Sequence, residues 1–118
     1  MVMREPRRLL LHLADGSRRA VEPDDVYYLE ADEDDTLVRL RGRLPLRDVR
    51  RLSEIEAAFA RCGFVRIHRS WVVNPAHVRK LRPRKSLGWE VAMDSPVNRV
   101  LPVSRQRLKV LLRAFGDA

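Results

Sequence analysis

Positive charge gathers in one segment of the chain whose apolar residues are typical of β-strands. Residues 64–85 contain seven Arg or Lys residues and no Asp or Glu. Val, Ile, Leu and Trp are interleaved with these bases, so the apolar side chains can enter a core while the basic ones face outward. Guanidinium and ammonium groups bind phosphate, and a rigidly held guanidinium also matches the O6 and N7 edge of guanine. The segment therefore indicates recognition of a polyanion such as a nucleic acid.

Charge is also divided unevenly along the whole chain. The net charge is +8 and the sequence pI is about 10.9. Residues 22–35 carry eight acids and no base, whereas residues 36–118 carry 19 bases and 6 acids. A basic surface of this size favours a polyanionic partner.

The length of the chain predicts one domain. A chain of 118 residues buries about two-thirds of its unfolded surface, and Cys62 has no second cysteine with which to form an internal disulfide. We expect a single domain over residues 1–118, with loose ends at 1–6 and 116–118. The sequence contains no apolar run long enough to span a membrane and no signal peptide. We therefore expect a cytoplasmic protein with no membrane segment.

The hydrophobic pattern predicts a mainly β fold with antiparallel strands and two short helices. The expected strands lie at 9–13, 18–22, 26–31, 37–41, 44–46, 65–68, 71–73, 89–93 and 99–103. Pro45 has no N–H to donate and places its strand at a sheet edge. Apolar residues at helical spacing predict helices over about 51–61 and 105–115. Gly63 ends the first helix, and Ser104 is the expected N-cap of the second.

Two arginines are the candidates for reading bases. Arg69 lies between the apolar residues Ile67 and Trp71, so a short turn with an anchor on each side would present its side chain. Arg105 follows the expected N-cap Ser104, and the free N–H groups at a helix start attract phosphate.

The other bases and hydroxyl groups in these regions are expected to bind phosphate. A turn around Pro83 would present one cluster of bases, and the last helix would present another. The expected phosphate-contacting residues are His68, Ser70, Arg79, Lys80, Arg82, Arg84, Lys85, Ser104, Arg107 and Lys109.

The sequence does not indicate a catalytic or metal site. His12, His68 and His77 lie far apart, and the sequence has no Gly-rich phosphate loop and no cluster with metal-ligand spacing. His68 and Ser70 lack a third group that would orient them for catalysis, so a polar pair that stabilises a turn is the simpler interpretation. We expect no enzyme activity, no metal and no cofactor.

Several motifs resemble those of one known family. Residues 64–74, Phe-Val-Arg-Ile-His-Arg-Ser-Trp-Val-Val-Asn, resemble the hallmark segment of LytTR domains, the LytR/AlgR family of bacterial DNA-binding output modules. Residues 26–31 resemble the early strand of that family, and residues 52–59 resemble its amphipathic helix. Residues 101–105, Leu-Pro-Val-Ser-Arg, resemble the motif before its last helix.

The resemblance implies an elongated stack of small antiparallel sheets whose loops enter successive major grooves of duplex DNA and bend it. Base contacts of the family fall on Thr36 or its neighbours, on Arg69 and on Arg105. The acidic residues 32–35, expected as a loop, would repel phosphate near the first of these. The resemblance also implies a transcription regulator of the response-regulator, two-component type, acting as two copies on repeated half-sites. An upstream receiver or sensor domain, common in the family, is expected to be absent from this sequence.

Two other functions fit the composition. A small β domain that binds RNA would also be basic, but Trp71 and Trp89 lie within apolar runs that favour core packing over exposed stacking. A protein-interaction module could use the acidic residues 22–35 against a basic partner. Sequence-specific binding of duplex DNA is the favoured function.

Overall fold

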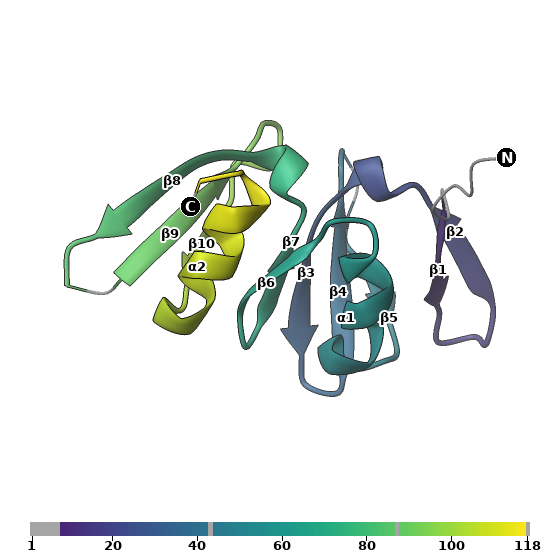
Figure 1. Cartoon of the computed structure of the whole chain (residues 1–118). Helices are drawn as coiled ribbons and strands as arrows, with labels where there is room; N and C mark the ends of the chain where they lie inside the picture. The colour runs from purple at the N-terminus through teal and green to yellow at the C-terminus, as the bar shows by residue number, and fades with distance from the viewer. Residues whose placement is uncertain (1–7, 43, 87, 118) are drawn as a thin grey trace, which may run out of the picture.

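Three small antiparallel sheets and two α-helices make up the part of the chain that the structure describes. This structure is a computed structural model, and it describes residues 8–42, 44–86 and 88–117. Figure 1 shows the sheets stacked side by side, with one helix against the middle sheet and the other beside the C-terminal sheet. The mainly β fold class expected from the sequence is confirmed.

The sheets follow one another along the chain. The N-terminal sheet is a hairpin of β1 (Leu9–His12) and β2 (Arg18–Val21). The middle sheet has the order β5-β4-β3-β7-β6 and consists of β3 (Val26–Asp32), β4 (Asp35–Leu40), β5 (Leu46–Asp48), β6 (Val65–His68) and β7 (Trp71–Val73). The C-terminal sheet has the order β10-β9-β8 and consists of β8 (Val78–Arg84), β9 (Gly88–Met93) and β10 (Val100–Val103).

The helices lie close to their predicted positions. Helix α1 (Leu52–Ala60) joins β5 to β6, and α2 (Arg105–Ala114) follows β10. Short 3-10 turns, η1 (Pro23–Asp25) and η2 (Pro75–His77), lead into β3 and β8. Gly63 has a φ of 90°, a conformation that favours glycine and ends the α1 region as predicted.

Two of the predicted elements shift. The strand expected at 44–46 is β5, and it begins at Leu46 because Pro45 has no N–H to donate to the ladder. β5 lies at the edge of the middle sheet, so the predicted edge position is confirmed. The basic stretch expected as a turn around Pro83 is instead the end of β8, where Pro83 lies opposite Trp89. A proline is compatible with β8 because β8 is an edge strand.

Two hydrophobic cores lie on the two sides of the middle sheet. The first core lies between this sheet, the N-terminal hairpin and α1, and it includes the buried Phe59. The second core packs β3, β6 and β7 against the C-terminal sheet and α2, and it includes Tyr27 and Met93. An irregularity in β3 between Val26 and Tyr28 lets two successive tyrosines face the second core.

Asn74 fixes the connection between the middle and C-terminal sheets. Its side-chain N–H groups donate to the carbonyl oxygens of Pro23 at 3.3 Å and Val26 at 3.1 Å. Its Oδ1 accepts from the N–H of Ala76 at 3.1 Å. One buried amide therefore satisfies main-chain groups from two distant segments.

Asp48 attaches the N-terminal hairpin to the middle sheet. Its buried carboxylate accepts from the main-chain N–H of His12 at 2.9 Å and from the guanidinium of Arg50 at 2.8 Å. Burial by itself raises the pKa of Asp48, but the hydrogen bonds from Arg50 and His12 outweigh it and leave the pKa below its ordinary value. The carboxylate is therefore charged in the native state at neutral pH.

Replacing Asp48 by Asn should destabilise the protein at neutral pH and have a smaller effect in acid. A carboxylate whose pKa is lowered by folding contributes its full stability above the unfolded pKa of about 3.9, and loses it as the pH falls through the folded value. Denaturant unfolding of both proteins from about pH 7 to about pH 3 should show the two stability curves converging. If the difference in unfolding free energy between the two proteins stays constant over this pH range, the charge of Asp48 does not contribute to stability.

Candidate nucleic-acid interface

The turn between β6 and β7 presents Arg69 to solvent. Val65 and Ile67 of β6 are buried in the second core, whereas Arg69 is exposed at the turn. Strands β6 and β7 pair in antiparallel register, with an irregularity between Arg66 and His68. The predicted turn is confirmed, and no ion pair among the described residues involves Arg69.

Arg66 holds this turn from the side of α1. Its Nε donates to the carbonyl oxygen of His68 at 2.7 Å, and its Nη2 donates to the carbonyl oxygen of Arg69 at 2.5 Å. Its Nη1 pairs with Glu56 of α1, and the Arg66 side chain is only 14% exposed. The guanidinium thereby braces the main chain that carries Arg69. Sequence analysis missed this role, because strand alternation marks Arg66 only as facing away from the second core.

His68 is a second brace within the turn. Its Nδ1 accepts from the N–H of Ser70 at 3.1 Å, and its ring centroid lies 5.0 Å from that of Trp71. Burial, followed by the charges of Arg69 and Arg66, lowers the pKa of His68. The imidazole therefore stays neutral to a lower pH than an ordinary histidine, which keeps Nδ1 able to accept. A polar pair that stabilises the turn was the sequence-based interpretation, and it is confirmed.

The start of α2 lies beside the same turn. The N–H of Ser104 donates to the carbonyl oxygen of Ile67 at 2.8 Å, close to Arg69 in the chain. Arg105 is the first residue of α2 and is exposed, and no ion pair among the described residues includes it. Ser104 occupies the predicted N-cap position, but its hydroxyl makes no capping hydrogen bond. The first turn of α2 therefore keeps unpaired N–H groups for an anion.

The turn between β3 and β4 meets the β6–β7 turn. The N–H of Ala31 donates to the carbonyl oxygen of Ser70 at 2.8 Å. The acidic loop expected at 32–35 is a tight turn between the two strands, with Glu33 at a φ of 56°. Figure 1 shows this turn, the β6–β7 turn and the start of α2 at the lower side of the view.

These three segments form one edge of the molecule, which we call the loop edge. It consists of residues 33–34, 69–70 and 104–105. Main-chain hydrogen bonds at Ser104 and Ala31 fix the outer two segments to the central one. The β6–β7 turn and the start of α2 therefore lie on one side of the molecule (Figure 1), and the arginines that they carry, Arg69 and Arg105, are both exposed.

Bases from neighbouring elements neutralise the acids of the β3–β4 turn. Arg47 pairs with Asp32 at 2.7 Å and with Asp35 at 3.2 Å. Arg51, at the N-cap of α1, pairs with Asp34 at 2.9 Å. Exposed pairs of this kind add little stability, but they reduce the repulsion that the acidic turn would exert on phosphate.

The structure corrects the prediction that Thr36 contacts a base. The Thr36 side chain is fully buried, and its hydroxyl donates to the carbonyl oxygen of Arg50 at 2.8 Å. A buried hydroxyl that is already paired has no surface to offer to DNA. The exposed members of this turn are Glu33 and Asp34.

The predicted phosphate-contacting residues are spread over several places. Arg82 and Arg84 of β8 both pair with Glu90, at 2.5 and 3.3 Å, so part of their charge is compensated. Lys85 follows β8 and is exposed. Arg107, on α2 near the loop edge, is half-buried.

Arg79 and Lys80 lie away from the loop edge. They line a groove together with Leu112 and Phe115, at the C-terminal end of α2. Arg105 is at the other end of this helix of 10 residues, which rises about 1.5 Å per residue and so spans about 15 Å. The structure therefore does not bring Arg79 and Lys80 together with Arg105.

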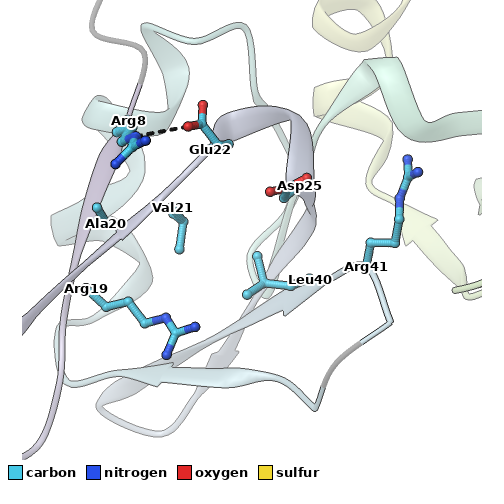
Figure 2. A pocket seen from close by; sticks show the side chains of 8 residues that line it. All are labelled: Arg8, Arg19, Ala20, Val21, Glu22, Asp25, Leu40 and Arg41. Carbon is cyan, nitrogen blue, oxygen red and sulfur yellow. Dashed lines mark hydrogen bonds and ion pairs between the residues drawn. The ribbon is translucent and has the colours of Figure 1, made fainter.

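A separate hollow of about 440 Å³ lies between the N-terminal hairpin and the middle sheet. Figure 2 shows the side chains that line it: Arg8, Arg19, Ala20, Val21, Glu22, Asp25, Leu40 and Arg41. Arg8 pairs with Glu22 at 2.9 Å, and Asp25 is the other acid in the lining. None of the predicted site residues lines this hollow.

The part of the chain that the structure describes contains no group of three or more His, Cys, Asp or Glu side chains placed to hold a metal ion. Neither of its helices has the length and apolar character needed to cross a membrane.

A small β domain that presents exposed arginines without ion pairs on neighbouring segments has the charge needed to bind a polyanion. The family model of the LytTr DNA-binding domain matches residues 16–116. The chain belongs to this family, which confirms the identification made from its motifs. The family is one of DNA-binding domains and not of enzymes.

Two relatives support the same assignment. The chain is 34% identical over 91 residues, or 75% of its length, to the CO-responsive transcriptional regulator RcoM of Rhodospirillum rubrum. It spans 36% of the length of that relative. A solved LytTr DNA-binding domain, from a Bacillus cereus protein assigned as a response regulator, is 26% identical to the chain. That structure superposes with a TM-score of 0.74, and the match covers 94% of this chain and 98% of the other.

Replacing Arg66 by Met should loosen the β6–β7 turn, because two main-chain carbonyls and Glu56 lose their donor. Losing about 1–2 kcal/mol of local stability should raise the hydrogen-exchange rate of the Ser70 amide by about tenfold, measured by NMR. The matched control is Arg61→Met, at the exposed C-cap of α1. The amide of Val38, in the middle sheet, reports global unfolding; an equal acceleration there and at Ser70 would contradict a local brace.

Proposed function

We propose that this protein binds duplex DNA in a sequence-dependent way and regulates transcription in bacteria. The loop edge faces the DNA, with the β6–β7 turn and the start of α2 directed into the major groove. Membership of the LytTr DNA-binding domain family supports DNA binding as the general activity. The particular residues and the groove are our proposal.

The observation that carries the proposal is the placement of two unpaired guanidinium groups on adjacent, braced segments. Arg69 lies on a turn held by Arg66. Arg105 begins α2 and follows Ser104, whose N–H donates to the carbonyl oxygen of Ile67. A guanidinium can donate in a bidentate fashion to guanine, and a fixed main-chain position beneath it lowers the entropic cost of that contact. Both arginines are therefore proposed base readers.

Phosphate contacts are assigned to the groups that flank these two arginines. His68, Ser70, Ser104 and Arg107 lie on or next to the loop edge, and Lys109 lies about one turn further along α2. Lys85, Arg82 and Arg84 would extend the contact along the C-terminal sheet. In the third segment the exposed Glu33 replaces Thr36, because a carboxylate accepts from the amino group of cytosine.

Two copies on repeated half-sites are proposed, because one domain of this size covers only a small stretch of duplex. The alternatives drawn from the sequence lose support. Trp71 and Trp89, which an RNA-stacking surface would need, are half-buried against the second core. The acids at 32, 34 and 35, which a basic protein partner would need, are already paired with Arg47 and Arg51.

Replacing Arg69 or Arg105 by Ala should reduce sequence discrimination. The preferred site is first obtained by selecting bound duplexes from a random pool, and affinities are then measured by fluorescence anisotropy. Each substitution should cost about 1–3 kcal/mol on the selected site and much less on random duplex. Arg61→Ala, an exposed base at the far end of α1, is the matched control. Equal losses on both duplexes would mean that the arginine contacts phosphate only.

The affinity for duplex DNA should fall steeply with salt. If about six phosphates are neutralised, log K should decrease with log salt at a slope near −5. Titration of a labelled duplex at several salt concentrations measures this slope, which Arg69→Ala should change little if Arg69 reads a base. A flat profile would reject the electrostatic contact altogether.

A further inference from the structure

An apolar groove of about 480 Å³ lies at the end of the molecule away from Arg105. Leu81 and Trp89 of the C-terminal sheet form one side, and Leu112 and Phe115 of the α2 region form the other. Phe115 is 45% exposed, which is high for an aromatic side chain beside a core. The groove therefore offers an apolar surface that no described part of the chain covers.

The walls of this groove are fixed by main-chain structure. Gly116, at a φ of 74°, ends α2 with its N–H bonded to the carbonyl oxygen of Arg113 at 2.9 Å. The N–H of Asp117 donates to the carbonyl oxygen of Leu112 at 2.9 Å, which completes a Schellman motif. Across the groove, Trp89 is held in register with Pro83 in the ladder of β8 and β9. A preformed groove binds a partner at a lower entropic cost than one that must fold on contact.

Basic side chains surround the apolar floor. Arg79 and Lys80 line the groove from β8, while Lys109 and Arg113 line an adjoining hollow of about 280 Å³ on α2. None of these four bases forms an ion pair among the described residues. Asp117 is the one acid that lines either hollow in the described part of the chain. The groove thus combines an apolar floor with a rim of four bases and one acid.

We propose that this groove docks an acidic peptide segment of a partner protein, one that carries large apolar side chains on one face. The apolar side chains of the peptide pack on the floor against Trp89 and Phe115, and its acidic side chains pair with the basic rim. The peptide therefore matches the groove in both shape and charge. The groove lies about 15 Å along α2 from Arg105. It therefore stays open while the loop edge is on DNA, and its assignment does not depend on the proposed function.

Neither a second copy nor DNA fits this groove as well. Self-association about a two-fold axis would bring two basic rims together, each on a chain of net charge +8. Phosphate has no apolar surface to place against Trp89 and Phe115, so an apolar floor adds nothing to its binding. An acidic, partly apolar peptide satisfies both the charge and the floor.

The test uses a short labelled peptide that places Leu or Phe on one face of a helix and Asp or Glu on the other. Fluorescence anisotropy should show saturable binding to the protein, both free and bound to duplex DNA. A scrambled peptide of the same composition should bind at least about tenfold more weakly, because its charge is equal but its apolar face is lost.

Two substitutions locate the binding. Phe115→Ala and Arg113→Glu should each weaken binding of the peptide by about tenfold or more while leaving affinity for duplex DNA unchanged. Arg61→Glu, an equal charge reversal at the C-cap of α1, is the control and should change peptide binding by less than about twofold. Circular dichroism confirms that each variant is folded.

Three outcomes would overturn the proposal. Equal binding of the scrambled peptide would mean that only net charge is recognised. Unchanged binding in both variants would place the peptide elsewhere. A dimer in sedimentation equilibrium that Phe115→Ala dissociates would make a second copy the occupant.

Discussion

The structure of the loop edge depends on the ion pair and the hydrogen bonds that the Arg66 guanidinium forms. Its guanidinium is committed to Glu56 and to two carbonyl oxygens of the β6–β7 turn. A basic turn that relied on its own arginine for support would have no charge left for a ligand. Here Arg66 makes the contacts that support the turn. Arg69, on the same turn, is therefore exposed and has no ion pair among the described residues.

Charges that are separated in the sequence are interleaved in space. The acidic residues 32–35 form a tight turn, and β5 and α1 bring Arg47 and Arg51 against it. At the other side of the molecule, Glu90 compensates Arg82 and Arg84. The acidic and basic segments are therefore less separated on the surface of the protein than they are in the sequence. Bases without an ion pair among the described residues occur at the loop edge and around the groove at the end of α2, and also elsewhere, as at Arg61.

Local patterns were sufficient to predict most of the fold. Alternation of apolar and polar residues identified the strands around Arg69, and glycine and proline positions marked their ends. The predictions failed where the outcome depends on strand pairing. Thr36 is polar yet buried, because the pairing of β4 with β5 brings its hydroxyl to the carbonyl oxygen of Arg50. The stretch around Pro83 contains turn-forming residues, but it pairs with β9 as an edge strand.

Local patterns also predicted part of the candidate site, but not the contacts between elements that are distant in the sequence. Exposure of Arg69 and Arg105 follows from their positions beside apolar anchors and at a helix start. The contact between Arg66 and Glu56 does not, since it requires α1 to approach the outer face of β6. The distance of Arg79 and Lys80 from the loop edge likewise follows only from the path of α2.

Main-chain hydrogen bonds, from Ser104 to Ile67 and from Ala31 to Ser70, connect the three segments at the loop edge. Such bonds are indifferent to the identity of the side chains that point outward. Exchange of the outward residues would therefore leave the spacing unaltered. Under the proposed function, substitution of a few outward residues would therefore change the preferred DNA sequence while the fold stays the same.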